Sequence, residues 1–174
     1  MSATTPTSEL DAINVMLTSI GESPVNTLGS GLQEAEIAEV VLDNVSRDVQ
    51  STGWHFNTEI RYNLARNSSN EITLPTNAIK IDKTNILREY EMDVVERGRK
   101  LYDRIGNKYT FDSDIEVDMV LLLSFDELPE TARRYITLKG ARVYQQRMIG
   151  SETLSKQLMM YQIEQHVLLL SRLK

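Results

Sequence analysis

The residues whose types and spacing could do chemistry are four acids in the stretch FDSDIEVDM, residues 111–119. An acid occupies every second position, and apolar side chains alternate with most of them. The acids are Asp112, Asp114, Glu116 and Asp118. On a β-strand they would share one face, with successive side chains about 7 Å apart. Such a row could hold a cation, supply a pair of catalytic carboxylates, or form a charged surface.

The pattern does not match a calcium-binding loop of the EF-hand type. A calcium loop of the EF-hand type needs a glycine at its sixth position and a glutamate at its twelfth. Counting from Asp112, these positions hold Val117 and Leu123. The alternation is typical of a half-buried strand whose polar face is solvated. We therefore expect a charged strand face, with a loose cation site as the lesser alternative.

Catalytic signatures are equally weak. Glycoside hydrolysis needs two carboxylates about 5–10 Å apart, but many pairs among 25 acids could meet that distance. His55 and His166 are far apart in sequence, without partners at metal-ligand spacing. The chain has no G-x-S-x-G motif and no glycine-rich phosphate loop. These observations predict a protein that is not an enzyme and needs no cofactor.

Composition narrows the class further. The chain has 174 residues, a formal net charge of −6 and a pI near 5.0, so it does not resemble a basic nucleic-acid binder. It has no cysteine, which excludes disulfides and zinc–thiolate sites. The start, MSATTPTSEL, lacks the basic and apolar regions of a signal peptide, and no apolar run approaches the roughly 20 residues that span a bilayer. We expect synthesis in the cytoplasm and no membrane contact.

Helical patterns occupy both ends of the chain. Ser8, followed by Asp11, predicts the N-terminus of a first helix. A second helix is expected over about 33–52, with an apolar stripe that Val40 and Leu42 widen. Pro129 and Glu130 indicate the start of a third helix. A last helix, for which Ser151 could provide the N-cap, is expected to run to the C-terminus.

The middle of the chain has the period of β-strands. Residues 54–65 alternate between apolar and polar side chains and predict a half-buried strand, in which Trp54 is a core or interface anchor. Further strands are expected at 71–75, 78–82, within 86–103, and after the Gly106-Asn107 turn. The fold class is therefore α+β. Residues 1–53 and 128–174 are expected to form a small helical bundle, and 54–127 a β-rich inserted domain.

The C-terminal stretch VLLLSRLK, residues 167–174, has more apolar surface than a small bundle can bury. Its leucines cover every side of a helix, and exposed apolar excess is typical of a partner contact. The alternative is that some of these residues cap the bundle's own core. The candidate contact residues are Val167, Leu168, Leu169, Leu170, Arg172 and Leu173.

Several segments, in order, resemble a known family. They are ELDAINVMLTSIGESPVNTL, VQSTGWHFNTE, ITLPTNAIKID, RGRKLYDRIGNKYTF and FDELPETARRYITLKGARVYQQRMIGS. Together, over residues 8–150, they resemble tail tubular protein A, the head-to-tail adaptor of short-tailed bacteriophages. No single motif is diagnostic, and it is the number and order of the segments that make the resemblance specific. The last twenty residues resemble the family least.

The resemblance implies a structural protein of the virion tail. It implies a ring of twelve copies between the portal and the tail nozzle, tail tubular protein B, with a central channel through which DNA passes without specific binding. The helical bundle would face the portal, and the β-rich part the nozzle and the tail fibres. A glycan hydrolase acting on the host cell envelope is the alternative, because some tail proteins are suspected of this activity.

Two hypotheses about surfaces follow. The acids of 112–118 would form a wall of the channel, which repels DNA phosphates, or a rim contact to the nozzle. Residues 167–174 would become ordered against the portal when the ring docks.

Overall fold

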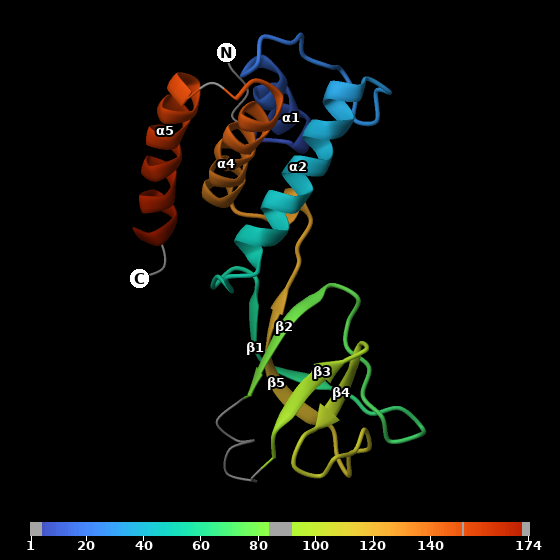
Figure 1. Ribbon diagram of the computed structural model, residues 1–174. Coiled ribbons are helices and arrows are strands. Elements are labelled where there is room, and N and C mark those ends of the chain that lie inside the picture. Colours follow the sequence, from blue (N-terminus) through green and yellow to red (C-terminus); the bar gives the residue numbers. More distant parts are fainter. Residues whose placement is uncertain (1–4, 84–91, 151, 172–174) are drawn as a thin grey trace. The chain divides into compact units, whose positions relative to one another are not determined.

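A computed structural model describes residues 5–83, 92–150 and 152–171 (Figure 1). The chain has the predicted α+β composition. Its helices are α1 (Glu9–Thr18), α2 (Gln33–Gln50), the short 3-10 helix η1 (Phe125–Glu127), α4 (Glu130–Met148) and α5 (Glu152–Ser171). Its strands are β1 (Thr58–Leu64), β2 (Ala78–Lys83), β3 (Val94–Arg97), β4 (Lys100–Asp103) and β5 (Ile115–Leu121).

The chain divides into two compact units, each described here by itself. One unit, the helical unit, comprises residues 1–49 and 124–174, and the other, the β unit, comprises residues 50–123. Both boundaries lie before the positions expected from the sequence, 53/54 and 127/128. The reason is Gln50, whose buried amide donates to the Leu123 carbonyl at 3.0 Å and accepts from the Leu123 N–H at 2.8 Å. These two bonds fix both ends of the β unit to each other.

The helical unit begins with the predicted cap. Ser8 Oγ accepts a hydrogen bond from the Asp11 N–H at 3.1 Å, and the Asp11 carboxylate accepts one from the Ser8 N–H at 2.9 Å. The Ser8 side chain and backbone hold the pKa of Asp11 below its usual value. This reciprocal pairing satisfies two of the free N–H groups of the first turn of α1.

Close packing in the helical unit centres on α4. Gly140 lies against α1 and α2, and a Cβ there would be 3.4 Å from Met16 Sδ and 3.6 Å from Leu42 Cδ1. Tyr144 is fully buried, and its hydroxyl donates to the Glu34 carbonyl at 3.0 Å. Leu42 is buried as predicted, whereas Val40 is exposed, so the apolar stripe of α2 is narrower than expected.

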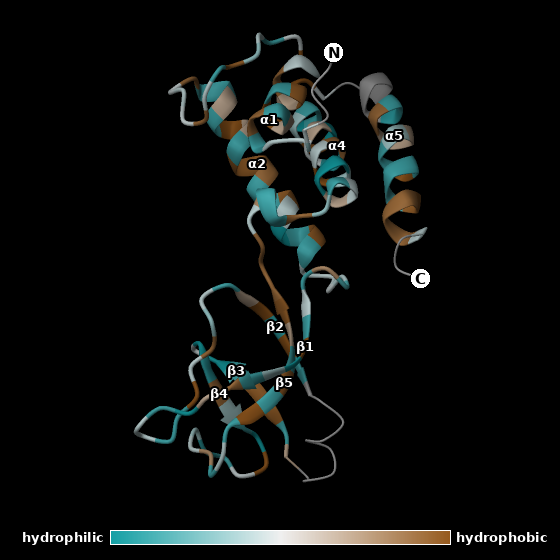
Figure 2. Cartoon of the chain, turned by 180° about the vertical axis from the view of Figure 1, so that it is seen from behind, coloured by the Kyte–Doolittle hydropathy of each residue, from teal (hydrophilic) through white to brown (hydrophobic). Residues whose placement is uncertain are grey.

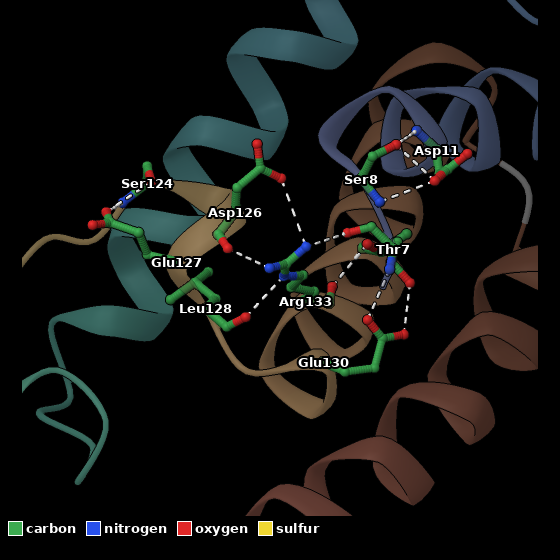
Figure 3. A network of polar contacts seen from close by, with 10 residues as sticks. Thr7, Ser8, Asp11, Ser124, Asp126, Glu127, Leu128, Glu130 and Arg133 are labelled. Carbon is green, nitrogen blue, oxygen red and sulfur yellow. Dashed lines mark hydrogen bonds and ion pairs between the residues drawn. The ribbon is translucent and has the colours of Figure 1, made fainter. Parts of the chain in front are cut away.

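A polar network closes the helical unit (Figure 3). Arg133, at the end of the first turn of α4, donates through Nε to the Leu128 carbonyl at 2.8 Å and through Nη1 to the Thr7 carbonyl at 3.0 Å. It also donates to the Asp126 carbonyl and lies 3.6 Å from the Asp126 carboxylate. Glu130 accepts from the Thr7 N–H at 2.8 Å and from the Thr7 hydroxyl at 2.7 Å. The N-terminal segment is thereby fixed to the segment that follows the β unit.

The β unit contains two small antiparallel sheets. The first has the order β1-β5-β2, and the second is the β3–β4 hairpin. Its core includes Ile72, Leu101, Phe111, Val117 and Met119. The hairpin agrees with the strands expected within 86–103, although residues 84–91 lie outside the described residues.

The strand predicted over 54–65 is wrong in its first part. Residues 54–57 form a turn, because the buried amide of Asn57 accepts from the Trp54 N–H at 2.8 Å and donates to the carbonyls of Gln50 and Leu121. Trp54 itself is buried, as expected for a core anchor. The half-buried alternation also fails, since Ile60 is 69% exposed.

Two other expected strands are reduced to isolated bridges. Residues 71–75 contribute only the bridges from Glu71 to Thr110 and from Thr73 to Lys100. The Gly106-Asn107 turn is present, with Asn107 in the left-handed region at φ 52°. The segment after it forms bridges at Lys108 and Thr110 instead of a strand.

We predict that Arg133→Lys lowers the free energy of unfolding by about 2 kcal/mol, because an ammonium group cannot reproduce three hydrogen bonds in a planar fork. Urea unfolding followed by far-ultraviolet circular dichroism measures the change. Arg134→Lys is the matched control, since Arg134 is adjacent and exposed. Equal stability of the two variants would contradict the role assigned to Arg133.

Candidate functional site

The acidic row is only partly on a strand. Glu116 and Asp118 lie on β5, where apolar neighbours are buried as the alternation predicted. Asp112 lies in a bend and Asp114 follows it, both before β5, so the expectation of one continuous strand face over 112–118 is wrong for these two.

Glu116 and Asp118 form hydrogen bonds with an irregular part of the neighbouring strand β1. The pairing of β1 with β5 shifts register between Glu59 and Tyr62, and Arg61 has a positive φ of 56°. Asp118 accepts from the Arg61 N–H at 2.9 Å, and Glu116 accepts from Arg61 Nε at 2.8 Å. The hydrogen bond with Glu116 raises the pKa of Arg61. These acids therefore have a structural role at a β-bulge, where a non-glycine residue with positive φ needs support.

The other two acids have looser contacts. Asp114 accepts from the Arg66 N–H at 3.1 Å. Asp112 is fully exposed and lies 3.8 Å from Lys108 Nζ. Within the described ranges, no group of three or more His, Asp or Glu side chains could hold a metal ion. Asp112 and Asp114 are thus the members of the row whose charge is most available to a partner.

The C-terminal candidates divide into buried and exposed residues. Leu169 is 1% exposed and belongs to the core of the helical unit, so the alternative of core capping applies to this residue. Val167, Leu168 and Leu170 are exposed at 58%, 43% and 45%. Figure 2 shows this hydrophobic end of α5. Arg172 and Leu173 lie outside the described residues.

The inner face of α5 packs on α4. The rings of His166 and Tyr135 are 5.0 Å apart, and the Gln162 amide donates to the Tyr135 hydroxyl at 3.4 Å. His166 is half-buried here. This inner face orients the opposite side of α5 outward.

Sequence reasoning missed the outward face of the earlier turns of α5. Met159, Met160 and Ile163 are exposed, Met160 at 74%. Gln157, Met160, Tyr161 and Glu164 line a hollow of about 440 Å³ on the same helix. The signal was present in the sequence, because apolar residues occur on all sides of residues 158–170 and a helix of that kind is normally covered on all sides.

Comparison with known proteins identifies the family of this chain. A family model described as tail tubular protein matches residues 10–173. The chain belongs to the tail tubular protein family. Tail tubular protein A of Klebsiella phage KP34 is 31% identical over 137 residues, which cover 78% of this chain and 71% of that relative. The family model, over residues 10–173, covers both the acidic row and all of α5.

Membership makes this tail tubular protein a structural component of a bacteriophage tail, and hence of the virion. The match adds no support to the glycan-hydrolase alternative. In the part of the chain that the structure describes, no helix is long and apolar enough to cross a membrane.

Proposed function

We propose that this tail tubular protein is a head-to-tail adaptor. In this proposal twelve copies form a ring between the portal and the tail nozzle, tail tubular protein B, and DNA passes through the central channel. The helical unit faces the portal, and the β unit faces the nozzle and the tail fibres. The ring size and the partners come from the family resemblance.

The observation that carries the proposal is the outward face of α5. Its inner face is already used against α4, yet Val167, Leu168 and Leu170 remain exposed on the last turns. Leaving such side chains in water costs roughly 25 cal/mol per Å² of apolar surface. A permanent partner that covers them removes this cost, as in interfaces whose centre is apolar. We assign the last turns of α5, with the residues that follow, to portal contact.

Charge supports the second part of the proposal. Twelve copies at −6 would together carry about −72. A channel lined by like charge would repel DNA phosphates and favour sliding over binding. Asp112 and Asp114 are the acids of the row that we assign to the channel wall or to a rim contact with the nozzle, because Glu116 and Asp118 already hold Arg61.

We predict that Val167→Asp combined with Leu168→Asp abolishes binding to the portal without unfolding the protein, since both side chains are exposed in the free chain. Co-sedimentation with purified portal measures binding, and circular dichroism measures folding. Truncation after Gln165 is a harsher version, because it also removes the buried Leu169. Ile60→Asp, an exposed change in the β unit, is the matched control. Wild-type portal binding by the double variant would rule out this contact.

We predict that Asp112→Lys combined with Asp114→Lys slows DNA delivery or blocks tail assembly, because the charge of two exposed side chains is reversed. The hydrogen bonds of Arg61 to Glu116 and Asp118 are not affected by these substitutions. Phage carrying the variant are assayed for assembled tails and for the rate of DNA entry. Glu116→Gln with Asp118→Asn is the comparison, since it neutralises acids but keeps hydrogen-bond acceptors for Arg61. Normal assembly together with normal delivery in the lysine variant would refute the assignment.

A further inference from the structure

Helix α5 has the reverse of the polarity expected for a helix on the surface of a bundle. Such a helix normally turns its apolar side toward the core and its polar side toward water. Among residues 156–171, the side chains that are buried or half-buried form the inner face of α5, and most of them are polar. They are Leu158, Gln162, Gln165, His166 and Leu169. The outer face consists of exposed apolar side chains, which are Met159, Met160, Ile163, Val167, Leu168 and Leu170. Exposed polar residues beside the outer face include Glu164.

The contact of the inner face with α4 is polar and incompletely paired. Tyr135 of α4 lies against it, with its ring 5.0 Å from that of His166 and its hydroxyl 3.4 Å from the Gln162 amide nitrogen. Arg142 lies two turns after Tyr135, on the same side of α4. Arg142 Nε and Gln162 Oε1 are buried and have no hydrogen-bond partner among the described residues. Each such atom lowers the stability of the contact, because it has lost water without gaining a partner in the protein.

Separation of α5 from α4 would improve the surroundings of both faces. The polar inner face would regain water, and the apolar outer face could be buried against a partner. Two leucines oppose the separation, since Leu169 is 1% exposed and Leu158 is half-buried. The outer face has more apolar side chains than the inner face, and the gain from burial grows with apolar area. The balance therefore favours α5 on α4 in the free protein and favours its departure once a partner is present.

Gly150 provides a position at which the direction of α5 can change. Helix α4 ends at Met148, and Gly150 follows with a positive φ of 70°. Its N–H donates to the Gln145 carbonyl at 3.1 Å, a left-handed turn of the kind that ends helices. A Cβ at Gly150 would come no closer than 4.0 Å to its neighbour, the Gln146 carbonyl oxygen. The turn therefore needs glycine for its backbone conformation and not for space.

We propose that α5 packs on α4 only while the protein is free, and that it leaves α4 by a change at Gly150 when the protein engages the portal. The inference rests on the proposed function, which assigns the last turns of α5 to portal contact. It adds that the whole helix changes partners, so that its inner face is freed as well. In the free protein the same opening occurs as a minor state, because the α4–α5 contact is weaker than the core around α4.

The opening can be measured in the free protein by thiol labelling, because the chain has no cysteine of its own. Leu169→Cys places a thiol on the buried part of the inner face, and Met16→Cys, at a fully buried position of α1, is the matched control. Labelling with a maleimide is followed by mass spectrometry. We expect Leu169→Cys to react at least about tenfold faster than Met16→Cys, because only the first needs a local opening. Equal rates would overturn the inference.

Substitution of Gly150 tests the turn itself. Gly150→Ala puts a Cβ on a residue with positive φ, so it should raise the labelling rate of Leu169→Cys by about tenfold. Gly150→Asn is the matched control and should have a smaller effect, since asparagine tolerates the left-handed region. A labelling rate that does not respond to Gly150→Ala would contradict an opening at this turn.

A tether between the helices tests whether portal binding requires the departure of α5. Tyr135→Cys and His166→Cys replace two rings that lie 5.0 Å apart, so a short bis-maleimide can join the two thiols within one chain. The control is the same double variant with each thiol capped by N-ethylmaleimide, and co-sedimentation measures binding to purified portal. We expect the tethered form to bind at least about tenfold more weakly than the capped form, because its binding-competent state is no longer accessible.

The outcomes separate this inference from the adaptor proposal. Equal portal binding by the tethered and capped forms would overturn the departure of α5 and leave the adaptor proposal intact. Wild-type protein that does not bind the portal would contradict the adaptor proposal, and the inference with it.

Discussion

The helical unit depends on the hydrogen bonds of Arg133, because its two parts are separated in the chain by the whole β unit. One guanidinium binds the carbonyls of Thr7, Asp126 and Leu128, so it joins the segment before α1 to the segment that leads into α4. Its side chain is only 12% exposed, which makes these bonds costly to lose. In the β unit, the Gln50 side chain joins the two ends of the unit in the same way, through two hydrogen bonds with the backbone of Leu123. Each unit thus has its own polar side chain, Arg133 or Gln50, that forms hydrogen bonds with backbone groups distant in sequence.

The packing of the helical unit leaves apolar surface of α5 exposed. Helix α4 is enclosed by α1 and α2, with Gly140 permitting close approach to Met16 and Leu42, and by α5 on another side. Among the described residues, α5 packs against α4 on its inner face, and apolar side chains on its other faces are exposed. The exposed remainder is consistent with a protein whose final environment is a tail and not solution.

The parts that sequence predicted well are those set by local chemistry. The Ser8–Asp11 cap and the start of α4 after Pro129 depend on neighbouring residues alone, and both are present. The predictions that failed depend on contacts from distant segments. Residues 54–57 have the period of a strand, but the buried amide of Asn57 binds Gln50 and Leu121 and imposes a turn. The exposure of Ile60 follows from the bulge at Arg61. This bulge is stabilised by Glu116 and Asp118, which are distant in the sequence.

The same distinction applies to the candidate surfaces. Alternation identified Glu116 and Asp118 as a polar face, but it gave no sign that both acids are engaged by Arg61. The excess of leucine predicted exposure at the C-terminus, while only tertiary packing selects Leu169 as the buried member. The sequence of α5 has apolar residues on all sides of the helix, which is the pattern that includes its exposed methionines. Which side of α5 faces outward follows only from the structure, in which His166 packs against Tyr135.

The most direct test of the adaptor account is the molar mass of the purified protein in solution, alone and mixed with its portal, measured by light scattering. The account predicts that the protein joins the portal in a stoichiometric ring, with a mass increase of about twelve chains of 19.8 kDa. A portal whose mass is unchanged by excess protein, under conditions in which both are folded, would contradict it.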